Sequence, residues 1–145
     1  ATPIEAESMR LHASSVAFDN RAVLIKGRSG SGKSSLALQL MAYGARLVAD
    51  DQVLIVEKDG WPMIQAPVPI SGMIEARYFG LLVADPIAEA RLAVVVDLDH
   101  IETERLPPER QLQIYSQPIP LFHKAETEAF PAAILQYLKG GKVLL

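Results

Sequence analysis

The sequence predicts an α/β fold built on a mixed sheet, and three observations support this prediction. Residues 22–26 are apolar and β-branched, typical of a strand, and lead through a glycine-rich loop into residues 36–43, which are largely good helix formers. Residues 92–96 form the most apolar run of the chain, which is typical of a central strand. Two further pairs of extended segments are separated by short turn sequences, as in antiparallel hairpins.

Length and composition narrow the possible functions. The chain has 145 residues, 50% of them hydrophobic, which predicts a single domain over residues 1–145 with one core. Its net charge of -3 argues against nucleic acid as a partner, because phosphate backbones attract basic surfaces. The absence of cysteine excludes disulfides and thiolate zinc sites. No apolar run is long enough to span a bilayer, so we expect a cytoplasmic protein without a membrane partner.

The first elements are expected to be extended. Residues 9–18 predict either a pair of strands or one bent strand, and Asp19-Asn20 predicts a two-residue hairpin turn because both residues tolerate a left-handed backbone. This turn leads directly into the strand at residues 22–26. A hairpin before a phosphate-binding loop differs from the usual parallel arrangement. The fold is therefore not expected to be that of an ordinary P-loop NTPase.

The loop after this strand fits the pattern G-x-x-x-x-G-K-[ST] of phosphate-binding loops. Its residues, which we predict to bind the phosphates of a nucleotide, are Gly27, Arg28, Ser29, Gly30, Ser31, Gly32, Lys33, Ser34 and Ser35. The glycines let backbone N–H groups close around phosphate oxygens, and the helix that follows adds its positive dipole end. Lys33 can reach the β- and γ-phosphates, and the Ser34 hydroxyl can bind Mg2+.

The rest of the chain alternates between strands and helices. In the helix, Leu36, Ala37, Leu40 and Met41 would share a buried face, and Gly44 suits its C-terminus. The remaining expected strands are a short one at 46–49, a hairpin of 52–57 and 61–65, the central strand at 92–96 ending at Asp97-Leu98-Asp99, and an extended segment at 111–119. The last expected element is a helix with Thr127 as its N-cap and Pro131 in its first turn, which ends at Gly140-Gly141.

A bound triphosphate also needs a carboxylate that orients the metal ion. In ordinary P-loop proteins this is an Asp at the end of an apolar strand. Asp97, after residues 92–96, fits this description, and so does Asp50, after residues 47–49. Either residue could equally be a turn residue at the end of a strand. The pattern alone leaves both candidates open.

Several segments occur in the order in which one known family has them. They are Leu11-His12, residues 27–35, residues 44–51, residues 74–77 with Gly80, residues 94–99, residues 104–106 and residues 118–120. The run from the phosphate loop to Asp51 is the specific part, since a phosphate loop alone does not distinguish families. On these residues the chain resembles the C-terminal catalytic domain of bacterial HPr kinase/phosphorylase, from Leu11 to about Gly141.

The resemblance implies a transferase, an ATP- and Mg2+-dependent serine kinase. Its substrate would be HPr, the phosphocarrier of the sugar phosphotransferase system. The resemblance also implies the reverse reaction, in which inorganic phosphate attacks the phosphoserine and pyrophosphate is released. The implied fold is a phosphoenolpyruvate-carboxykinase-like mixed sheet with a helix after the phosphate loop and a C-terminal helix. The implied assembly is a homo-oligomer, a hexamer in the family. Family members carry a separate N-terminal domain, so this chain is expected to be a short form or a fragment.

By position, the resemblance also implies roles for individual residues. Asp50 would be the acid/base that takes the proton of the serine hydroxyl, with His12 near the transferring phosphate and Arg105 neutralising charge in the transition state. The residues that match metal-associated positions are Ser34, Asp51 and Glu75. Adjacent carboxylates raise one another's pKa unless a cation intervenes, which agrees with a metal at this point. Arg77 lies in the family's signature segment without an assigned role.

The chain departs from the family pattern at two places, and the second of them favours kinase over phosphorylase activity. Tyr78 stands where the signature segment has glycine, and residues 124–128 are acidic where the family has a basic stretch. Two other functions stay open: a P-loop kinase of another protein or of a small molecule, and a regulatory nucleotide-binding module without transfer activity. The presence of Lys33, Ser34 and Asp50 argues against the module.

Overall fold

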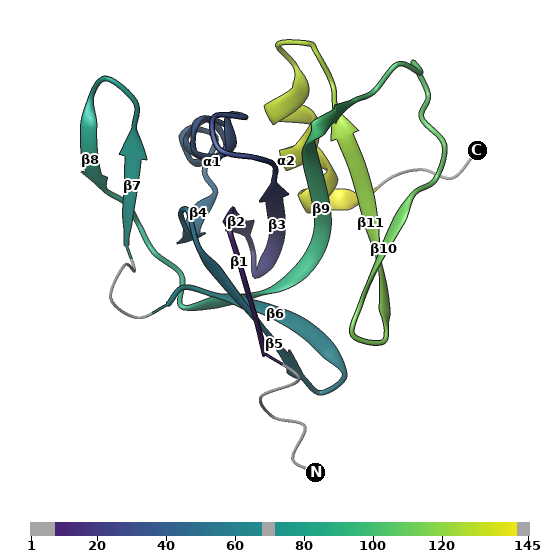
Figure 1. Cartoon of the computed structure of the whole chain (residues 1–145), viewed down its shortest axis with the longest axis horizontal. Coiled ribbons are helices and arrows are strands. Elements are labelled where there is room, and N and C mark those ends of the chain that lie inside the picture. Colours follow the sequence, from purple (N-terminus) through teal and green to yellow (C-terminus); the bar gives the residue numbers. More distant parts are fainter. Residues whose placement is uncertain (1–7, 68–71, 142–145) are drawn as a thin grey trace.

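A computed structural model describes residues 8–67 and 72–141 of the chain. It consists of a nine-stranded mixed sheet with the strand order β1-β5-β6-β9-β3-β2-β4, in which β11 also pairs with β9 and β10 with β11. Figure 1 shows the two helices beside this sheet and a separate two-stranded arm, β7 and β8. The predicted α/β fold with a mixed sheet is confirmed. The ends of the predicted domain lie outside the described residues.

The strand β9 (Glu89–Ile101) organises the sheet. It pairs antiparallel with β6 at its beginning, parallel with β3 along its middle and parallel with β11 toward its end. The central strand predicted at 92–96 is therefore confirmed but is longer than predicted. The prediction that it ends at Asp97-Leu98-Asp99 is wrong, because Asp97 pairs inside the sheet and the strand continues to Ile101, which pairs with Lys124 of β11.

The N-terminal segment forms two strands, β1 (Ser8–Leu11) and β2 (Ala13–Phe18), which separate at His12. The first pairs with β5 and the second with β3 (Arg21–Lys26) and β4 (Arg46–Ala49). Asp19 and Asn20 both have positive φ, 50° and 68°, as the predicted two-residue turn requires. The hairpin before the phosphate loop is confirmed.

Three more hairpins complete the strands. β5 (Val53–Lys58) and β6 (Trp61–Gln65) form the predicted hairpin. The segment predicted as extended at 111–119 is a hairpin of β10 (Gln111–Ile114) and β11 (Gln117–Lys124). β7 (Met73–Ala76) and β8 (Gly80–Val83) form the arm.

The two helices lie on one face of the sheet. α1 (Lys33–Ala42) buries Leu36, Ala37 and Leu40, and its C-terminus is closed by N–H groups of Gly44 and Ala45, which bond carbonyls of Met41 and Leu40. α2 (Phe130–Gly140) begins three residues after the predicted N-cap, Thr127. Thr127 instead closes a turn before the helix, where its carbonyl accepts the N–H of Phe130 and its hydroxyl that of Ala129.

Period-two alternation along the strands builds two cores, one on each face of the sheet. In β3, Val23 and Ile25 pack toward the helices, while Ala22 and Leu24 face the opposite core. The second core is enclosed by β5, β6, β10 and β11, which curl over that face. No helix within residues 8–67 and 72–141 has the length and apolar character needed to cross a bilayer.

Candidate active site

The phosphate loop joins the end of β3 to the start of α1 in a conformation that needs glycine. Gly27 has φ 154° and Gly32, the residue before α1, has φ 101°. A Cβ added at Gly27 would lie 2.5 Å from Ser31 Oγ and 3.3 Å from Leu98 Cβ. A side chain at Gly27 would therefore force Ser31 or the loop backbone to shift, in a backbone conformation that favours glycine.

The groups inside the loop suit an anion. Lys33 is buried and its Nζ donates to the carbonyls of Gly27 at 2.8 Å and Arg28 at 3.0 Å, so the ammonium is held within the loop. No side chain caps the first turn of α1, which contains no acidic residue. Ser31 Oγ is buried without a hydrogen-bond partner among the described residues. Free helix N–H groups, a fixed cation and an unused hydroxyl are the groups that bind phosphate.

We expect replacement of Gly27 by alanine to weaken both the fold and nucleotide binding. The Cβ clash with Ser31 Oγ forces the loop open, at a cost of about 1–3 kcal/mol in unfolding free energy. Gly44→Ala is the matched control, since Gly44 also has positive φ but no atom within 4 Å of an added Cβ. Urea unfolding and ATP titration of both variants measure the effects. Equal ATP affinities for the two variants would contradict a phosphate-binding role for this loop.

Asp50 links the phosphate loop to two other parts of the chain. It follows β4, is only 8% exposed, and its Oδ1 accepts hydrogen bonds from Ser34 Oγ at 2.6 Å and Ser14 Oγ at 2.8 Å. Its Oδ2 accepts the backbone N–H of Glu75, on β7, at 3.2 Å. Of the two candidates for the metal-orienting carboxylate, Asp50 is therefore the one bonded to the serine of the loop.

Asp51 turns away from Asp50 and toward His12. Its backbone is left-handed, with φ 73°, a conformation that non-glycine residues rarely adopt and that occurs often at functional sites. Its N–H donates to Ser14 Oγ at 3.3 Å and its carbonyl accepts the N–H of Ala13 at 3.1 Å, which holds the bend. His12 Nδ1 lies 3.3 Å from Asp51 Oδ1, and both side chains are about half exposed or more. An exposed imidazole–carboxylate pair thus lies beside the buried Asp50.

The carboxylate of Asp97 interacts with two nearby residues of its own strand. Its Oδ1 accepts the N–H of Asp99 at 2.9 Å, and its Oδ2 lies 2.9 Å from His100 Nδ1. Burial alone would raise the pKa of Asp97, but the Asp99 N–H, the His100 imidazole and the Lys26 ammonium outweigh it and hold that pKa below its ordinary value of 3.8. Asp97 stays ionised and stabilises the segment that carries Asp99, whose carboxylate accepts the N–H of Arg28 at 3.1 Å.

Asp97→Asn is expected to reduce stability rather than transfer. Because the folded-state pKa is lowered, the stabilisation by Asp97 is present above pH 3.8 and is lost as the pH falls through that lower pKa. The difference in unfolding free energy between wild type and variant should be about 1 kcal/mol near pH 7 and should shrink below pH 3.8. Urea unfolding of wild type and variant, near pH 7 and below pH 3.8, measures this difference in unfolding free energy. Loss of transfer in this variant with normal transfer in Asp50→Asn would instead make Asp97 the metal-orienting residue.

The side chains of the other predicted site residues do not contact Asp50. Glu75 reaches the cluster through its backbone N–H, while its side chain is exposed. Arg77 lies just after β7, which ends at Ala76, in the turn beside Tyr78. Arg105 is exposed on the loop after β9 and lines a pocket beside α2, so the structure does not bring it to Asp50. Its predicted role at the transferring phosphate stays a prediction.

Sequence reasoning missed Ser14. This residue is fully buried in β2 and its hydroxyl bonds both to Asp50 Oδ1 and to the N–H of Asp51. The available signal was a pair of serines inside an otherwise apolar strand, since buried hydroxyls need partners. Its hydroxyl thus holds the carboxylate of Asp50 and the backbone of Asp51 at the same time.

The residues present fit Mg2+ held together with a nucleotide. Within residues 8–67 and 72–141, no three His, Asp or Glu side chains are close enough to form a metal cage. Mg2+ is usually held by one or two protein oxygens, with phosphates and water completing its shell. Ser34 Oγ and Asp50 provide such oxygens at the mouth of the loop. The predicted metal role of Ser34 fits this arrangement, while those of Asp51 and Glu75 stay predictions.

The architecture and the loop together define the fold as that of a P-loop kinase-like protein. Comparison with solved structures agrees, since the "Hpr(Ser) kinase/phosphatase" of Coxiella burnetii superposes with a TM-score of 0.74, over 90% of this chain and 88% of that one. At 21% sequence identity this likeness shows the fold.

A sequence model described as the HPr Serine kinase C-terminal domain matches residues 5–111, and the chain belongs to this family. Curated relatives include the HPr kinase/phosphorylase of Clostridium tetani, 44% identical over 53% of this chain, and that of Clostridium botulinum, 33% identical over 66% of it. The matched regions make up 25% and 34% of those proteins, so the chain spans about a quarter to a third of their length.

Proposed function

We propose that this protein is an ATP- and Mg2+-dependent kinase that phosphorylates a serine of the phosphocarrier HPr. The observation that supports this most is the hydrogen bond from Ser34 of the phosphate loop to Asp50, directly beside the exposed His12–Asp51 pair. The acceptor is proposed from the relatives, which are HPr kinase/phosphorylases. The proposed setting is the regulation of carbohydrate metabolism in the cytoplasm.

The roles proposed for Asp50 and Asp51 differ because one side chain is buried and the other is exposed. Asp50 is buried and both of its oxygens already accept hydrogen bonds, so it is suited to hold the metal with Ser34. Bound Mg2+ would supply charge neutralisation on the β- and γ-phosphates. Asp51 is exposed and pairs with an imidazole, so it can meet the hydroxyl of a protein substrate. This reverses the roles predicted from sequence, where Asp50 was the acid/base and Asp51 a metal ligand.

In the proposed transfer, Asp51 accepts the proton of the HPr serine hydroxyl as the serine oxygen bonds to the γ-phosphorus. The bond from that phosphorus to the β–γ bridging oxygen breaks, and ADP leaves. Lys33 and the N-terminus of α1 stabilise negative charge on the phosphates. His12 holds the Asp51 carboxylate in place through Nδ1. Phosphoserine could be attacked by inorganic phosphate in the same site, with pyrophosphate as the product.

A homo-oligomer, a hexamer in the family, stays part of the proposal. The arm of β7 and β8 supports a partner at this face, because it stands apart from the main sheet and carries the exposed apolar residues Tyr78, Phe79, Leu81 and Val83. β7 bonds Asp50 through the backbone N–H of Glu75, one residue before the last residue of the strand, so a partner on the arm would lie next to the proposed transfer site.

The test is a transfer assay with the purified chain, Mg2+, labelled ATP and HPr from the same organism. We expect label on wild-type HPr and none on HPr whose target serine is replaced by alanine. Added phosphate should then release the label if the reverse reaction operates. ATP binding without transfer to HPr would overturn the proposal in favour of another protein or small-molecule acceptor, or of a nucleotide-binding module.

A further inference from the structure

A large cavity lies between α2 and the loop that joins β9 to β10. Its volume is about 810 Å3, which is within the range of small-molecule sites. The described residues that line it come from that loop, from β11 and the turn after it, and from α2. None of these residues belongs to the phosphate loop, residues 27–35, and neither Asp50 nor Asp51 is among them. The cavity is therefore a space separate from the candidate active site.

The loop between β9 and β10 is tied at both ends, which keeps the cavity open. At one end the N–H of Glu102 donates to the carbonyl of Lys124 at 2.8 Å, and at the other the N–H of Leu121 donates to the carbonyl of Arg110 at 2.9 Å. The carboxylate of Glu102 also binds the guanidinium of Arg110, which joins the two ends to each other. Two consecutive prolines restrict the backbone between them. The loop is thus a fixed wall, as in a pre-formed binding site.

Apolar side chains line this space from both sides. On the loop, Leu106 is 68% exposed. On β11 and α2, Phe122 and Tyr137 meet edge to face with ring centroids 5.3 Å apart, and Phe130 lines the cavity at the start of α2. An apolar ligand between these walls would remove both of them from water, which is favourable in proportion to the area buried. The lining therefore favours a ligand with an apolar body.

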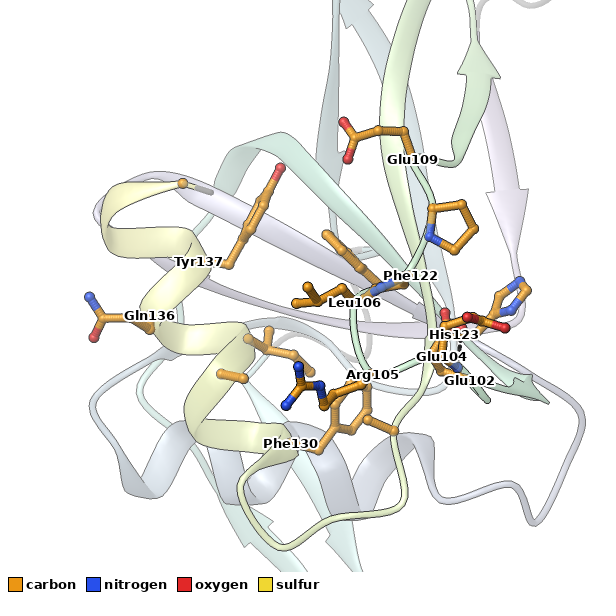
Figure 2. Close-up of a pocket in the computed structure, with 16 residues that line it drawn as sticks. Glu102, Glu104, Arg105, Leu106, Glu109, Phe122, His123, Phe130, Gln136 and Tyr137 are labelled. Atoms are coloured by element: carbon orange, nitrogen blue, oxygen red, sulfur yellow. Dashed lines mark hydrogen bonds between the residues drawn. The ribbon is translucent and has the colours of Figure 1, made fainter. Parts of the chain in front are cut away.

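Arg105 gives the cavity one positive charge that is available to a ligand. It is the one Lys or Arg among the described residues of the lining, and no ion pair or hydrogen bond joins its side chain to another residue within 8–67 and 72–141. Figure 2 shows its guanidinium directed toward α2, whereas Glu104 lies on the side of His123. A guanidinium matches the planar geometry of a carboxylate. Glu104 and Glu109 would repel a ligand with several negative charges, so a single negative charge fits this lining best.

We infer that this cavity binds an apolar monocarboxylate. The aliphatic or aromatic body lies between the loop and α2, and the carboxylate binds Arg105. The inference goes beyond the proposed kinase function and does not depend on it, because the lining shares no residue with the phosphate loop. It gives Arg105 a role in binding that differs from the role at the transferring phosphate implied by the resemblance.

The test uses ligands that separate the charge from the apolar chain. Octanoate and octanol have chains of equal length, but only octanoate carries a carboxylate, and butyrate has the carboxylate on a short chain. Each is titrated calorimetrically into the wild-type chain and three variants. Arg105→Gln removes the positive charge, and Ala133→Trp fills the cavity from an exposed position of α2 that lines it. Ala132→Trp is the matched control, since Ala132 is exposed on the same helix but does not line the cavity.

We expect wild type to bind octanoate more tightly than octanol or butyrate. Arg105→Gln should lower octanoate affinity about tenfold or more, because a charge-assisted hydrogen bond is lost. Its octanol affinity should equal that of wild type, which also shows that this variant is folded. Ala133→Trp should abolish the binding of both octanoate and octanol, because the indole occupies the space of the chain. Ala132→Trp should bind both ligands as wild type does.

Several results would overturn the inference. Wild type that shows no saturable octanoate binding would contradict the site itself, and equal losses of octanoate and octanol affinity in Arg105→Gln would contradict the contact with the carboxylate. Normal octanoate binding by Ala133→Trp would place the ligand elsewhere on the chain. Sedimentation of the same proteins tests another occupant. An oligomer of wild type that Ala133→Trp dissociates and Ala132→Trp does not would assign the cavity to a second copy of the chain instead.

Discussion

Replacement of Lys33 by alanine is expected to abolish phosphoryl transfer and to weaken ATP binding about 100-fold or more, because charge-assisted hydrogen bonds to phosphate are lost. Lys33 is buried and its Nζ is held by the carbonyls of Gly27 and Arg28, so the cation is positioned before any ligand arrives. No other ammonium in the loop can replace it. Calorimetric titration with Mg2+–ATP and the HPr transfer assay measure the two effects.

Lys58→Ala serves as the control for the removal of one positive charge. Lys58 forms an exposed ion pair with Glu89 at the β5–β6 hairpin, and pairs of this kind contribute little to stability. Its loss should leave ATP affinity and transfer unchanged. Normal turnover in Lys33→Ala would contradict the assignment of residues 27–35 as the phosphate site. Equal losses in both variants would mean that overall charge, rather than the loop, governs binding.

The parts of the fold that the sequence predicted are those fixed by local chemistry. The turn at Asp19 and Asn20 needs two residues that accept positive φ, and the chain supplies them there. The phosphate loop needs glycine where its backbone closes, and Gly27 provides it. Such requirements are satisfied within a few residues, so the pattern of residues alone indicates them.

The parts that could not be predicted depend on contacts between distant segments. Asp97 follows an apolar run and therefore looked like the end of a strand, but β11 pairs beyond it and extends β9 to Ile101. Thr127 has the residue type of an N-cap, yet α2 begins at Phe130 because Thr127 closes a preceding turn. In each case a long-range pairing or a competing local bond overrode the preference of one residue.

The same limit applies to the two adjacent carboxylates. The sequence placed Asp50 and Asp51 together at the site but could not indicate which one faces the phosphate loop. Their directions are set by Ser14 and Ala13, more than thirty residues earlier, which hold Asp50 inward and Asp51 in a left-handed bend. The spacing of the acidic residues in the sequence does not predict tertiary hydrogen bonds of this kind.

The replacements Asp51→Asn and Asp50→Asn should therefore affect different steps. Asp51→Asn is expected to keep Mg2+–ATP binding but to lower transfer to HPr about 100- to 10,000-fold, because an amide cannot accept the hydroxyl proton. Asp50→Asn keeps an oxygen that can accept from Ser34 and Ser14, so the fold should persist while the metal-dependent part of ATP affinity falls. ATP titrations with and without Mg2+, together with single-turnover transfer, separate the two effects.

His12→Ala completes this comparison, because His12 contacts Asp51 and no contact joins it to Asp50 among the described residues. If His12 orients the Asp51 carboxylate, its loss should slow transfer without changing Mg2+-dependent ATP affinity. It should also have little further effect in the Asp51→Asn background, since residues that act as a unit are not additive. If the two replacements instead lower the transfer rate by independent factors that multiply in the double variant, His12 does not act through Asp51. A transfer defect larger in Asp50→Asn than in Asp51→Asn, with ATP affinity preserved, would restore Asp50 as the acid/base and leave Asp51 as the metal ligand.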